Sequence, residues 1–240
     1  MTRLLSNSRA RILDVCTFIA QHLLPQECLL CTARAAGGTL CDGCRAQLPR
    51  LSPLRCAQCA TPTPQSDICG ACLAAPPAFT SVTAAYAYAW PLAPLIQQFK
   101  YAGNLALARL LAESACESIR SPVDLIIPMP LGPARLRERG FNQALELARY
   151  ISTATRTPLA AAACRRVLDG APQARLPWRQ RAKNIRGAFV CDVDLSGLRV
   201  AVVDDVITTG ATLDELARTL RKAGAQEVHG WMVARTLKQL

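Results

Sequence analysis

AVVDDVITTGAT (residues 201–212) joins an apolar run to two adjacent acids and then to a loop of Thr, Gly and Ala. The residues before the acids are almost all apolar, as expected for a strand that is buried on both faces of a parallel sheet. The segment TLDELARTLRKAG follows with helical spacing of its apolar residues, and Gly224 is predicted to end that helix. The stretch therefore predicts a strand, a loop and a helix, with Asp204 and Asp205 at the carboxyl end of the strand.

The segments before and after this stretch alternate between strand and helix patterns. VTAAYAYAW, VDLIIPMP and QEVHGWMVAR are strand-like, whereas LALARLLAESACESI and NQALELARYISTAT have helical spacing. This alternation predicts an α/β domain over residues 80–240, with a parallel sheet flanked by helices. Ligands of such sheets bind beyond the carboxyl ends of the strands, so the two acids are expected at a ligand site.

The loop after the acids has the composition of a phosphate site. Its small residues leave backbone amides free to converge on an anion, and the helix that follows favours negative charge at its N-terminus. Thr208, Thr209 and Thr212 can add hydroxyl donors. The acids suit the hydroxyls of an attached sugar, or a magnesium ion held near those hydroxyls. A ribose 5-phosphate fits both halves of the stretch.

Eight of the twelve cysteines form four CxxC pairs within two copies of one unit. Each copy has a CxxC pair, nine residues and a second CxxC pair. Two such pairs can supply the four thiolates of a tetrahedral zinc ion, so the sequence predicts two structural zinc sites. Pairing within each copy gives the shorter loops and is preferred, while crosswise pairing stays open. The eight predicted ligands are Cys28, Cys31, Cys41, Cys44, Cys56, Cys59, Cys69 and Cys72.

Two other interpretations of these cysteines are weaker. A disulfide framework needs an oxidising compartment, and no secretory signal is visible in the sequence. A thioredoxin-like redox motif would occur once, at a junction between strand and helix, and not four times. The four remaining cysteines, Cys16, Cys116, Cys164 and Cys191, are expected to be ordinary buried thiols.

The composition bounds the class of protein and its partners. The 240 residues include 28 Lys and Arg against 17 Asp and Glu, a net charge of +11 that favours an anionic partner such as a free phosphate or nucleic acid. Residues 1–24 do not have the pattern of a secretory signal, because Asp14 interrupts the apolar stretch and no cleavage site follows. They are expected to form an amphipathic helix, since their apolar residues have helical spacing: Ile12, Val15, Cys16, Ile19 and Leu23. No stretch reaches the roughly 18 to 20 apolar residues of a membrane span, and a cytoplasmic location is expected. Residues 25–75 would form a double zinc ribbon, with LAAPPAFT as a linker to the α/β domain.

Two resemblances narrow this interpretation. VAVVDDVITTGAT resembles the phosphoribosyl pyrophosphate (PRPP) motif of type I phosphoribosyltransferases. CLLC, LIQQFKYAGN, IIPMPLGPARLRERGFNQ and RRVLDGAPQARLPWRQRAKNIRGAF resemble the ComF family, the competence-associated proteins that include GntX. The second resemblance covers nearly the whole chain and implies a zinc module followed by a phosphoribosyltransferase-like domain. One departure is Gly132, where many relatives carry His.

The resemblance to these families assigns roles to individual residues. Arg suits pyrophosphate because its planar fork meets phosphate oxygens in two places. If the stretch RLRER is considered by itself, the alternative to a pyrophosphate site is the solvent-exposed start of a helix. Asp204 and Asp205 would hold the ribose hydroxyls, Thr208, Thr209, Gly210, Ala211 and Thr212 the 5-phosphate, and Arg135, Arg139, Gly140, Asn142 and Gln143 the pyrophosphate with magnesium.

The basic segment 165–187 would be the flexible loop that closes over the substrate. It holds seven Lys or Arg and the single acid Asp169, and Gln173, Arg181 and Asn184 match the family pattern there. Closure would exclude water from the reacting carbon and bring positive charge to the leaving pyrophosphate. The alternative interpretation of this segment is a disordered basic loop. Asp204, Asp205, Arg139 and Arg181 are the residues expected to act in catalysis, if catalysis occurs.

Two functions are compatible with these motifs. In the first, the chain binds PRPP with magnesium and takes part in natural competence, where it handles internalised single-stranded DNA with other competence proteins. In the second, it is an active phosphoribosyltransferase of nucleotide metabolism, in which an oxocarbenium-like transition state forms as pyrophosphate leaves. No motif selects an acceptor base, so the sequence leaves both functions open.

Overall fold

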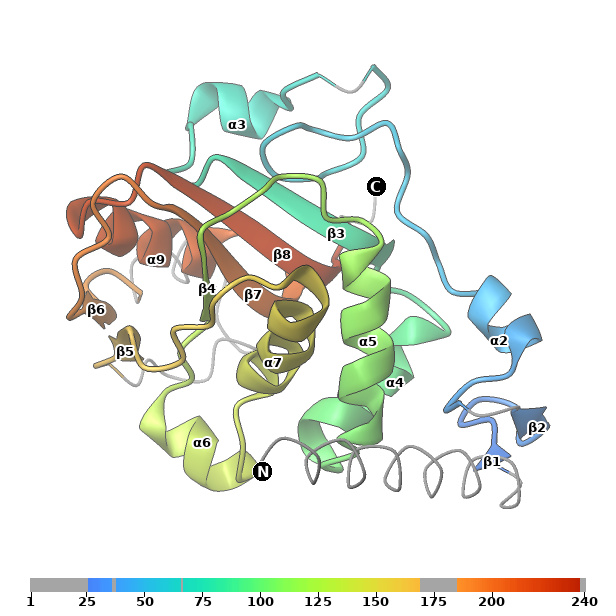
Figure 1. The fold of residues 1–240 in the computed structure, drawn as a ribbon. Helices are drawn as coiled ribbons and strands as arrows, with labels where there is room; N and C mark the ends of the chain where they lie inside the picture. Colours follow the sequence, from blue (N-terminus) through green and yellow to red (C-terminus); the bar gives the residue numbers. More distant parts are fainter. Residues whose placement is uncertain (1–25, 36–37, 66, 169–184, 238–240) are drawn as a thin grey trace, which may run out of the picture. The chain divides into compact units, whose positions relative to one another are not determined.

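The structure is a computed structural model and describes residues 26–35, 38–65, 67–168 and 185–237. The predicted helix over residues 1–24 lies outside this range. In the part of the chain that is described, no helix combines the length and the apolar character that crossing a membrane requires. The elements in Figure 1 are β1 (Gln26–Glu27), β2 (Arg34–Ala35), α2 (Asp42–Ala46), α3 (Gly70–Ala74), β3 (Ser81–Ala87), α4 (Leu92–Tyr101), α5 (Ala106–Cys116), β4 (Leu125–Pro128), α6 (Pro133–Arg139), α7 (Gln143–Thr155), β5 (Cys164–Arg166), β6 (Phe189–Cys191), β7 (Arg199–Ile207), α9 (Ala211–Lys222) and β8 (Glu227–Arg235).

The predicted parallel sheet is confirmed. Four strands are hydrogen-bonded in the order β3-β8-β7-β4, and every pairing is parallel. Its central strand β7 holds Val200, Val202 and Val203 fully buried, because helices cover both faces of the sheet. The strand is longer than the sequence predicted. It does not stop at the two acids but continues to Ile207, which pairs with Arg235 of β8.

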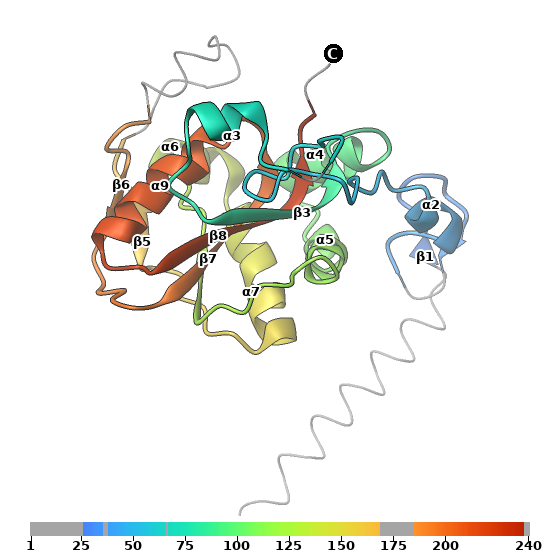
Figure 2. The same cartoon turned by 90° about the horizontal axis from the view of Figure 1, so that it is seen from above.

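Helices cover the two faces of this sheet. Helices α5 and α7 pack on one face and α9 on the other (Figure 2). Helix α9 buries Leu213, Leu216, Ala217 and Leu220, the spacing of an apolar stripe on a helix. It approaches β8 so closely that a Cβ added to Gly230 would lie 2.6 Å from Leu213 Cδ2. Only residues 208–210 separate β7 from α9, so the N-terminus of α9 lies at the carboxyl end of β7.

The chain divides into two compact units, Met1–Leu48 and Pro49–Leu240. The second unit begins with residues that extend the sheet. The amide of Leu51 donates to the Ala85 carbonyl (3.0 Å), and the amide of Ala87 donates to the Pro49 carbonyl (2.8 Å). The second group of four cysteines therefore belongs to the same compact unit as the sheet.

Candidate functional site

The two acids lie on neighbouring positions of β7, so their side chains leave opposite faces of the strand. The half-buried Asp204 lines a small hollow of about 50 Å³ together with the loop that follows the strand. Asp205 is only 2% exposed and is neutralised by a lysine, and its carboxylate is still close enough to Asp204 to affect the acidity of that group. The sequence placed both carboxylates at one site, but the structure gives each its own surroundings.

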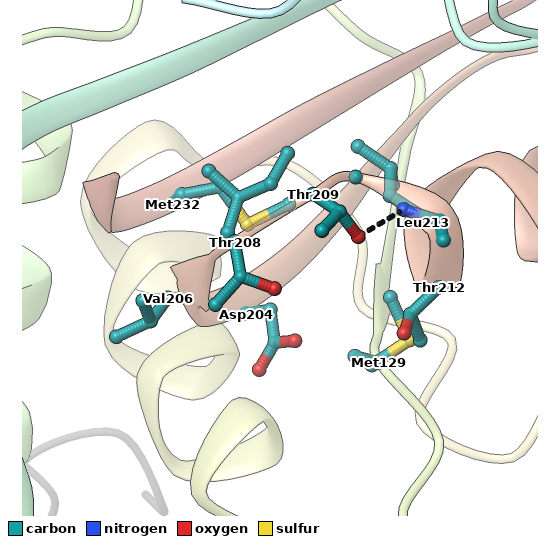
Figure 3. A pocket seen from close by; sticks show the side chains of 11 residues that line it. Met129, Asp204, Val206, Thr208, Thr209, Thr212, Leu213 and Met232 are labelled. Carbon is teal, nitrogen blue, oxygen red and sulfur yellow. Dashed lines mark hydrogen bonds between the residues drawn. The ribbon is translucent and has the colours of Figure 1, made fainter. Parts of the chain in front are cut away.

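The loop after β7 and the first turn of α9 together form most of the hollow. Figure 3 shows Asp204 and the side chains of Thr208, Thr209 and Thr212 around the same space. Gly210 has a φ of +84°, in the left-handed region, and is the N-cap residue of α9. A side chain is strained in that conformation, which explains a glycine at the point where the loop enters the helix. The predicted phosphate residues Thr208, Thr209, Gly210, Ala211 and Thr212 are therefore brought together with Asp204.

Lys100 of α4 is a site residue to which the sequence analysis assigned no role. Its Nζ lies 2.8 Å from Asp205 Oδ2, and its side chain is 19% exposed. Burial disfavours the charged ammonium, but the Asp205 carboxylate outweighs this effect, and the pKa of Lys100 rises above its ordinary value. The one signal in the sequence was a lysine within the family-like stretch LIQQFKYAGN.

Asp204 has the most strongly shifted acidity at the site. Desolvation, together with the charge of Asp205, raises the pKa of Asp204 to about 8, and Lys100 opposes this shift only in part. Burial and the neighbouring Asp205 charge therefore favour the protonated form of Asp204 as long as no further cation is close to it.

The predicted pyrophosphate residues follow β4, on α6 and at the start of α7. The Arg139 guanidinium lies 4.9 Å from the centre of the Tyr101 ring and donates to the Tyr101 hydroxyl at 3.4 Å. This contact connects the end of α6 to the end of α4, next to Lys100. Arg135 lies half-buried on the same helix, and Gly140 ends it in the left-handed conformation, with a φ of +77°.

The next two predicted residues have structural contacts. The Asn142 carboxamide caps α7 by accepting from the Ala144 amide (3.0 Å), and it donates to the Met129 carbonyl at 3.1 Å. Gln143 is 7% exposed at the first position of the helix. Gln173, Arg181 and Asn184 lie outside the described residues, and so does most of the basic segment 165–187.

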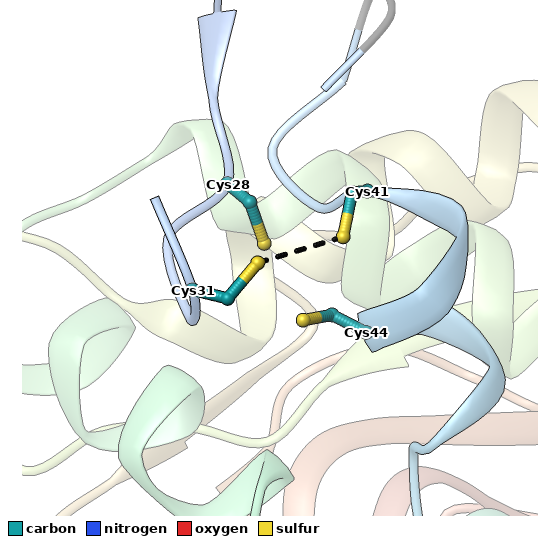
Figure 4. Close-up of side chains that lie close together, drawn as sticks. All are labelled: Cys28, Cys31, Cys41 and Cys44. Atoms are coloured by element: carbon teal, nitrogen blue, oxygen red, sulfur yellow. Dashed lines mark hydrogen bonds between the residues drawn. The ribbon is translucent and has the colours of Figure 1, made fainter. Parts of the chain in front are cut away.

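The cysteines gather into two tetrads, each from one copy of the repeat. The first tetrad is Cys28, Cys31, Cys41 and Cys44, and the second is Cys56, Cys59, Cys69 and Cys72; within each, all sulfur atoms lie within 4.8 Å of one another. The first tetrad is shown in Figure 4.

Sulfur separations within the tetrads match zinc. Cys31 and Cys41 Sγ are 3.7 Å apart, and Cys59 and Cys69 Sγ are 3.6 Å apart. Four sulfurs around one zinc ion at 2.3 Å would be separated by about 3.8 Å, so both donor sets fit structural zinc. The pairing within each repeat, which the sequence left open against crosswise pairing, is the observed one.

Comparison with known proteins agrees with these features. Residues 19–73 match the family model described as double zinc ribbon domain. DNA utilization protein YhgH of Escherichia coli K12 is 34% identical over 170 residues, which cover 68% of this chain and 75% of that protein. Competence protein F of Haemophilus influenzae is also 34% identical, with 66% of this chain and 74% of that protein covered. The chain belongs to the ComF family.

More distant similarities of this ComF-family chain were found among solved structures. A purine phosphoribosyltransferase from Pyrococcus horikoshii is 24% identical with a TM-score of 0.30, and the match covers 59% of this chain and 82% of that one. A glutamine phosphoribosylpyrophosphate amidotransferase from B. subtilis is 22% identical with a TM-score of 0.37, covering 51% and 25% of the two chains.

Proposed function

We propose that this ComF-family chain binds PRPP together with magnesium in the hollow at the end of β7. The supporting observation is that one carboxyl group and three threonine hydroxyls surround a space at the N-terminus of α9. The loop of residues 208–212 would hold the 5-phosphate, since its amides and hydroxyls are donors and the helix end favours an anion. Asp204 and Asp205 would accept from the ribose hydroxyls.

The charges of the site suit a ligand that arrives with a divalent cation. Lys100 already neutralises Asp205, and Asp204 holds a proton in the free chain. Carboxylate oxygen is a ligand that magnesium prefers, and a bound magnesium ion would supply positive charge near the carboxyl groups and the ligand oxygens. Asp204 would then release its proton and become the charged partner of the ribose. Lys100 would act as a positioning residue that keeps Asp205 ionised.

Arg139 is the proposed cation on the pyrophosphate side. It is held against Tyr101, close to Lys100, and belongs to the helix that follows the carboxyl end of β4. Arg135, Gly140, Asn142 and Gln143 remain proposed neighbours of the pyrophosphate. Gln173, Arg181 and Asn184 are proposed to join them from the basic segment.

Calorimetry on the zinc-loaded chain tests the PRPP site. Asp204→Asn keeps the shape of the side chain and removes its charge, so PRPP affinity in the presence of magnesium should fall at least about tenfold, the effect of losing a charge-assisted hydrogen bond. Asp194→Asn is the control, because Asp194 is an exposed acid of the same unit that accepts from the Ser196 hydroxyl of its own loop. An unchanged affinity in Asp204→Asn would contradict the proposal.

The raised pKa of Asp204 also predicts how the stability of the free chain depends on pH. The folded chain keeps the proton that the unfolded chain loses near the ordinary value of 3.8, and releases it only near pH 8. The free energy of unfolding should therefore fall as pH rises through this window. Asp204→Asn should remove this part of the pH dependence, which denaturant titrations of both proteins between pH 6 and pH 8.5, compared as a difference, would measure. Parallel curves would show that Asp204 is ionised throughout.

The names of the relatives support a role in DNA handling. Proteins named for DNA utilization and competence cover most of this chain, and the net charge of +11 suits a polyanion. We propose that the chain acts in the cytoplasm on internalised single-stranded DNA, together with other competence proteins. A titration of labelled oligonucleotide at several salt concentrations, with and without PRPP and magnesium, tests this role. Binding should weaken steeply with salt, and weaker binding with PRPP present would link the two ligands.

A second candidate is an active phosphoribosyltransferase. The observation in its favour is Tyr101, which is 68% exposed and lies beside Arg139 and Lys100. Such a ring next to the ribose site offers a surface on which a planar acceptor can stack. Pyrophosphate release from PRPP, measured with a panel of nucleobases, would support this candidate if one base accelerates release and Tyr101→Ala abolishes the acceleration. Release that no base accelerates would favour the binding function.

A further inference from the structure

Two cysteines outside the tetrads and outside the PRPP hollow lie opposite each other. Strands β5 and β6 pair antiparallel, with Cys164 directly opposite Cys191. The sequence by itself predicts ordinary buried thiols at both positions. Their placement is a feature of the tertiary structure, because the two residues flank the whole basic segment 165–187 in the sequence.

The hydrogen bonds around this pair determine how close the two backbones are. The Asp192 amide donates to the Ala163 carbonyl (3.2 Å), and the Val167 amide donates to the Ala188 carbonyl (2.8 Å). Hydrogen-bonded and non-hydrogen-bonded pairs alternate along an antiparallel ladder, so Cys164 and Cys191 occupy a non-hydrogen-bonded pair. Cα atoms of such pairs are about 4.5 Å apart. Disulfides join Cα atoms about 4.4 to 6.8 Å apart, so the backbone already has a separation that a disulfide spans.

The two thiols differ in their access to solvent. Cys164 is 7% exposed and packs into the core, whereas Cys191 is half-buried and its thiol faces the Val193 carbonyl at 3.7 Å. Burial, with the neighbouring Cys191 sulfur adding to it, raises the pKa of the Cys164 thiol. A reagent from solvent therefore reaches Cys191 first, and Cys164 is the second thiol of the pair.

We propose that Cys164 and Cys191 are a reversible thiol–disulfide site for low-molecular-weight disulfides such as glutathione disulfide. The Cys191 thiolate attacks one sulfur of the reagent, forms a mixed disulfide and releases one thiolate. The Cys164 thiolate then attacks the Cys191 sulfur of this mixed disulfide, displaces the second thiolate of the reagent and forms the Cys164–Cys191 bond. Two electrons pass from the protein to the reagent, which leaves as two thiols with the two protons of the cysteines.

The bond would hold the β5–β6 pair together next to the helix of the PRPP loop. Strand β6 packs against α9, and the Gly187 amide donates to the Glu215 carboxylate of that helix at 2.7 Å. Oxidation would join Cys164 to Cys191 covalently across this strand pair, and reduction would leave its non-covalent contacts, the hydrogen bonds and the Arg165–Asp192 ion pair. This site is independent of whether PRPP is the ligand at β7.

Peptide mapping of the zinc-loaded full chain tests the pairing. Trypsin should release TPLAAAACR (residues 157–165) and GAFVCDVDLSGLR (residues 187–199), each with one cysteine. After incubation with glutathione disulfide and alkylation of free thiols, the two peptides should be recovered joined, and dithiothreitol should separate them. Cys116→Ser should give the same joined product, because Cys116 belongs to α5 and has no part in the pair.

Two results would overturn the proposal. The first is a wild-type chain in which Cys191 keeps glutathione and no joined peptide forms. The second is a joined yield no higher in the native chain than in chain unfolded with urea, since folding would then contribute nothing to the pairing. Hydrogen exchange supplies an independent readout. The Val167 and Asp192 amides, which bond across the hairpin, should exchange severalfold more slowly in the oxidised chain, and equal rates would show that the bond does not hold the hairpin.

Discussion

In both cysteine tetrads the chain turns in the same way. The Thr32 amide donates to the Cys28 carbonyl at 2.9 Å, and the Ala60 amide donates to the Cys56 carbonyl at 3.0 Å. Thr32 and Ala60 are both left-handed, with φ of 60° and 57°. A short helix starts after the third cysteine of each tetrad, α2 in the first and α3 in the second. The two tetrads thus share their local backbone structure as well as their cysteine spacing.

The residue after the left-handed position distinguishes the two tetrads. It is Ala33 in the first and Thr61 in the second. The Thr61 hydroxyl lies 3.1 Å from Cys59 Sγ and accepts from Arg235 Nε and Nη2 at 3.0 and 2.6 Å. Arg235 is 7% exposed at the carboxyl end of β8, so this hydroxyl connects the second tetrad to the sheet. Ala33 has no group that could make such a connection.

Burial of the second tetrad follows from the same connection. Cys56, Cys59 and Cys72 are buried in the core that also holds Phe79 and Leu213, whereas Cys31 of the first tetrad is exposed. The second copy of the metal-binding unit thus belongs to the compact unit that contains the sheet, and the first copy belongs to the other compact unit. Ligand spacing therefore predicts the metal site but not how much that site contributes to the stability of the sheet domain.

Replacing one zinc ligand in each tetrad should give the largest difference in stability between the two tetrads. Cys72→Ser should lower the free energy of unfolding of the unit Pro49–Leu240 by more than about 4 kcal/mol, because the loss of a metal leaves buried thiols in its core. Cys44→Ser is the matched change in the first repeat and should alter that free energy by less than about 1 kcal/mol. Denaturant unfolding and zinc content would be measured together. Equal destabilisation by both changes would abolish the distinction between the tetrads.

A medium effect is expected from Thr61→Ala, which gives the second repeat the residue of the first. The Arg235 guanidinium would lose its acceptor while staying buried, at a cost of about 1 to 3 kcal/mol in the same unfolding experiment. In a double-mutant cycle with Arg235→Met, the two changes should cost clearly less than the sum of the single changes. Ala33→Thr is the reciprocal control and should leave the unit Pro49–Leu240 unchanged. Additive effects would mean that the hydroxyl and the guanidinium act separately.

The smallest effect concerns the left-handed residues. Glycine adopts this conformation without strain, so Thr32→Gly should strengthen zinc binding in the first tetrad by about 0.5 to 1 kcal/mol. Ala60→Gly should be close to neutral, since it also removes a methyl group that is fully buried. Competition with a chelator would measure both changes. A gain from Ala60→Gly as large as that from Thr32→Gly would show that the surroundings of the second tetrad do not constrain this position.

Several features of the molecule followed from the sequence alone because their determinants are close together in the chain. The ligands of each tetrad lie within one short repeat, so spacing was sufficient to identify them. The same holds for the strand β7, the loop of residues 208–212 and the helix α9, where apolar pattern and glycine position act locally. Membership of the ComF family was also visible in such local motifs.

Which of these local features act together depends on the tertiary structure. It separated Asp204, which faces the hollow, from Asp205, which is paired with Lys100 of a distant helix. It likewise joined Thr61 to Arg235 and placed Cys164 opposite Cys191. In each case the partners are far apart in the sequence, and their contact depends on strand register and on which face of an element each side chain leaves. The local sequence does not determine the register or the face, because both arise from the packing of the whole sheet and its helices.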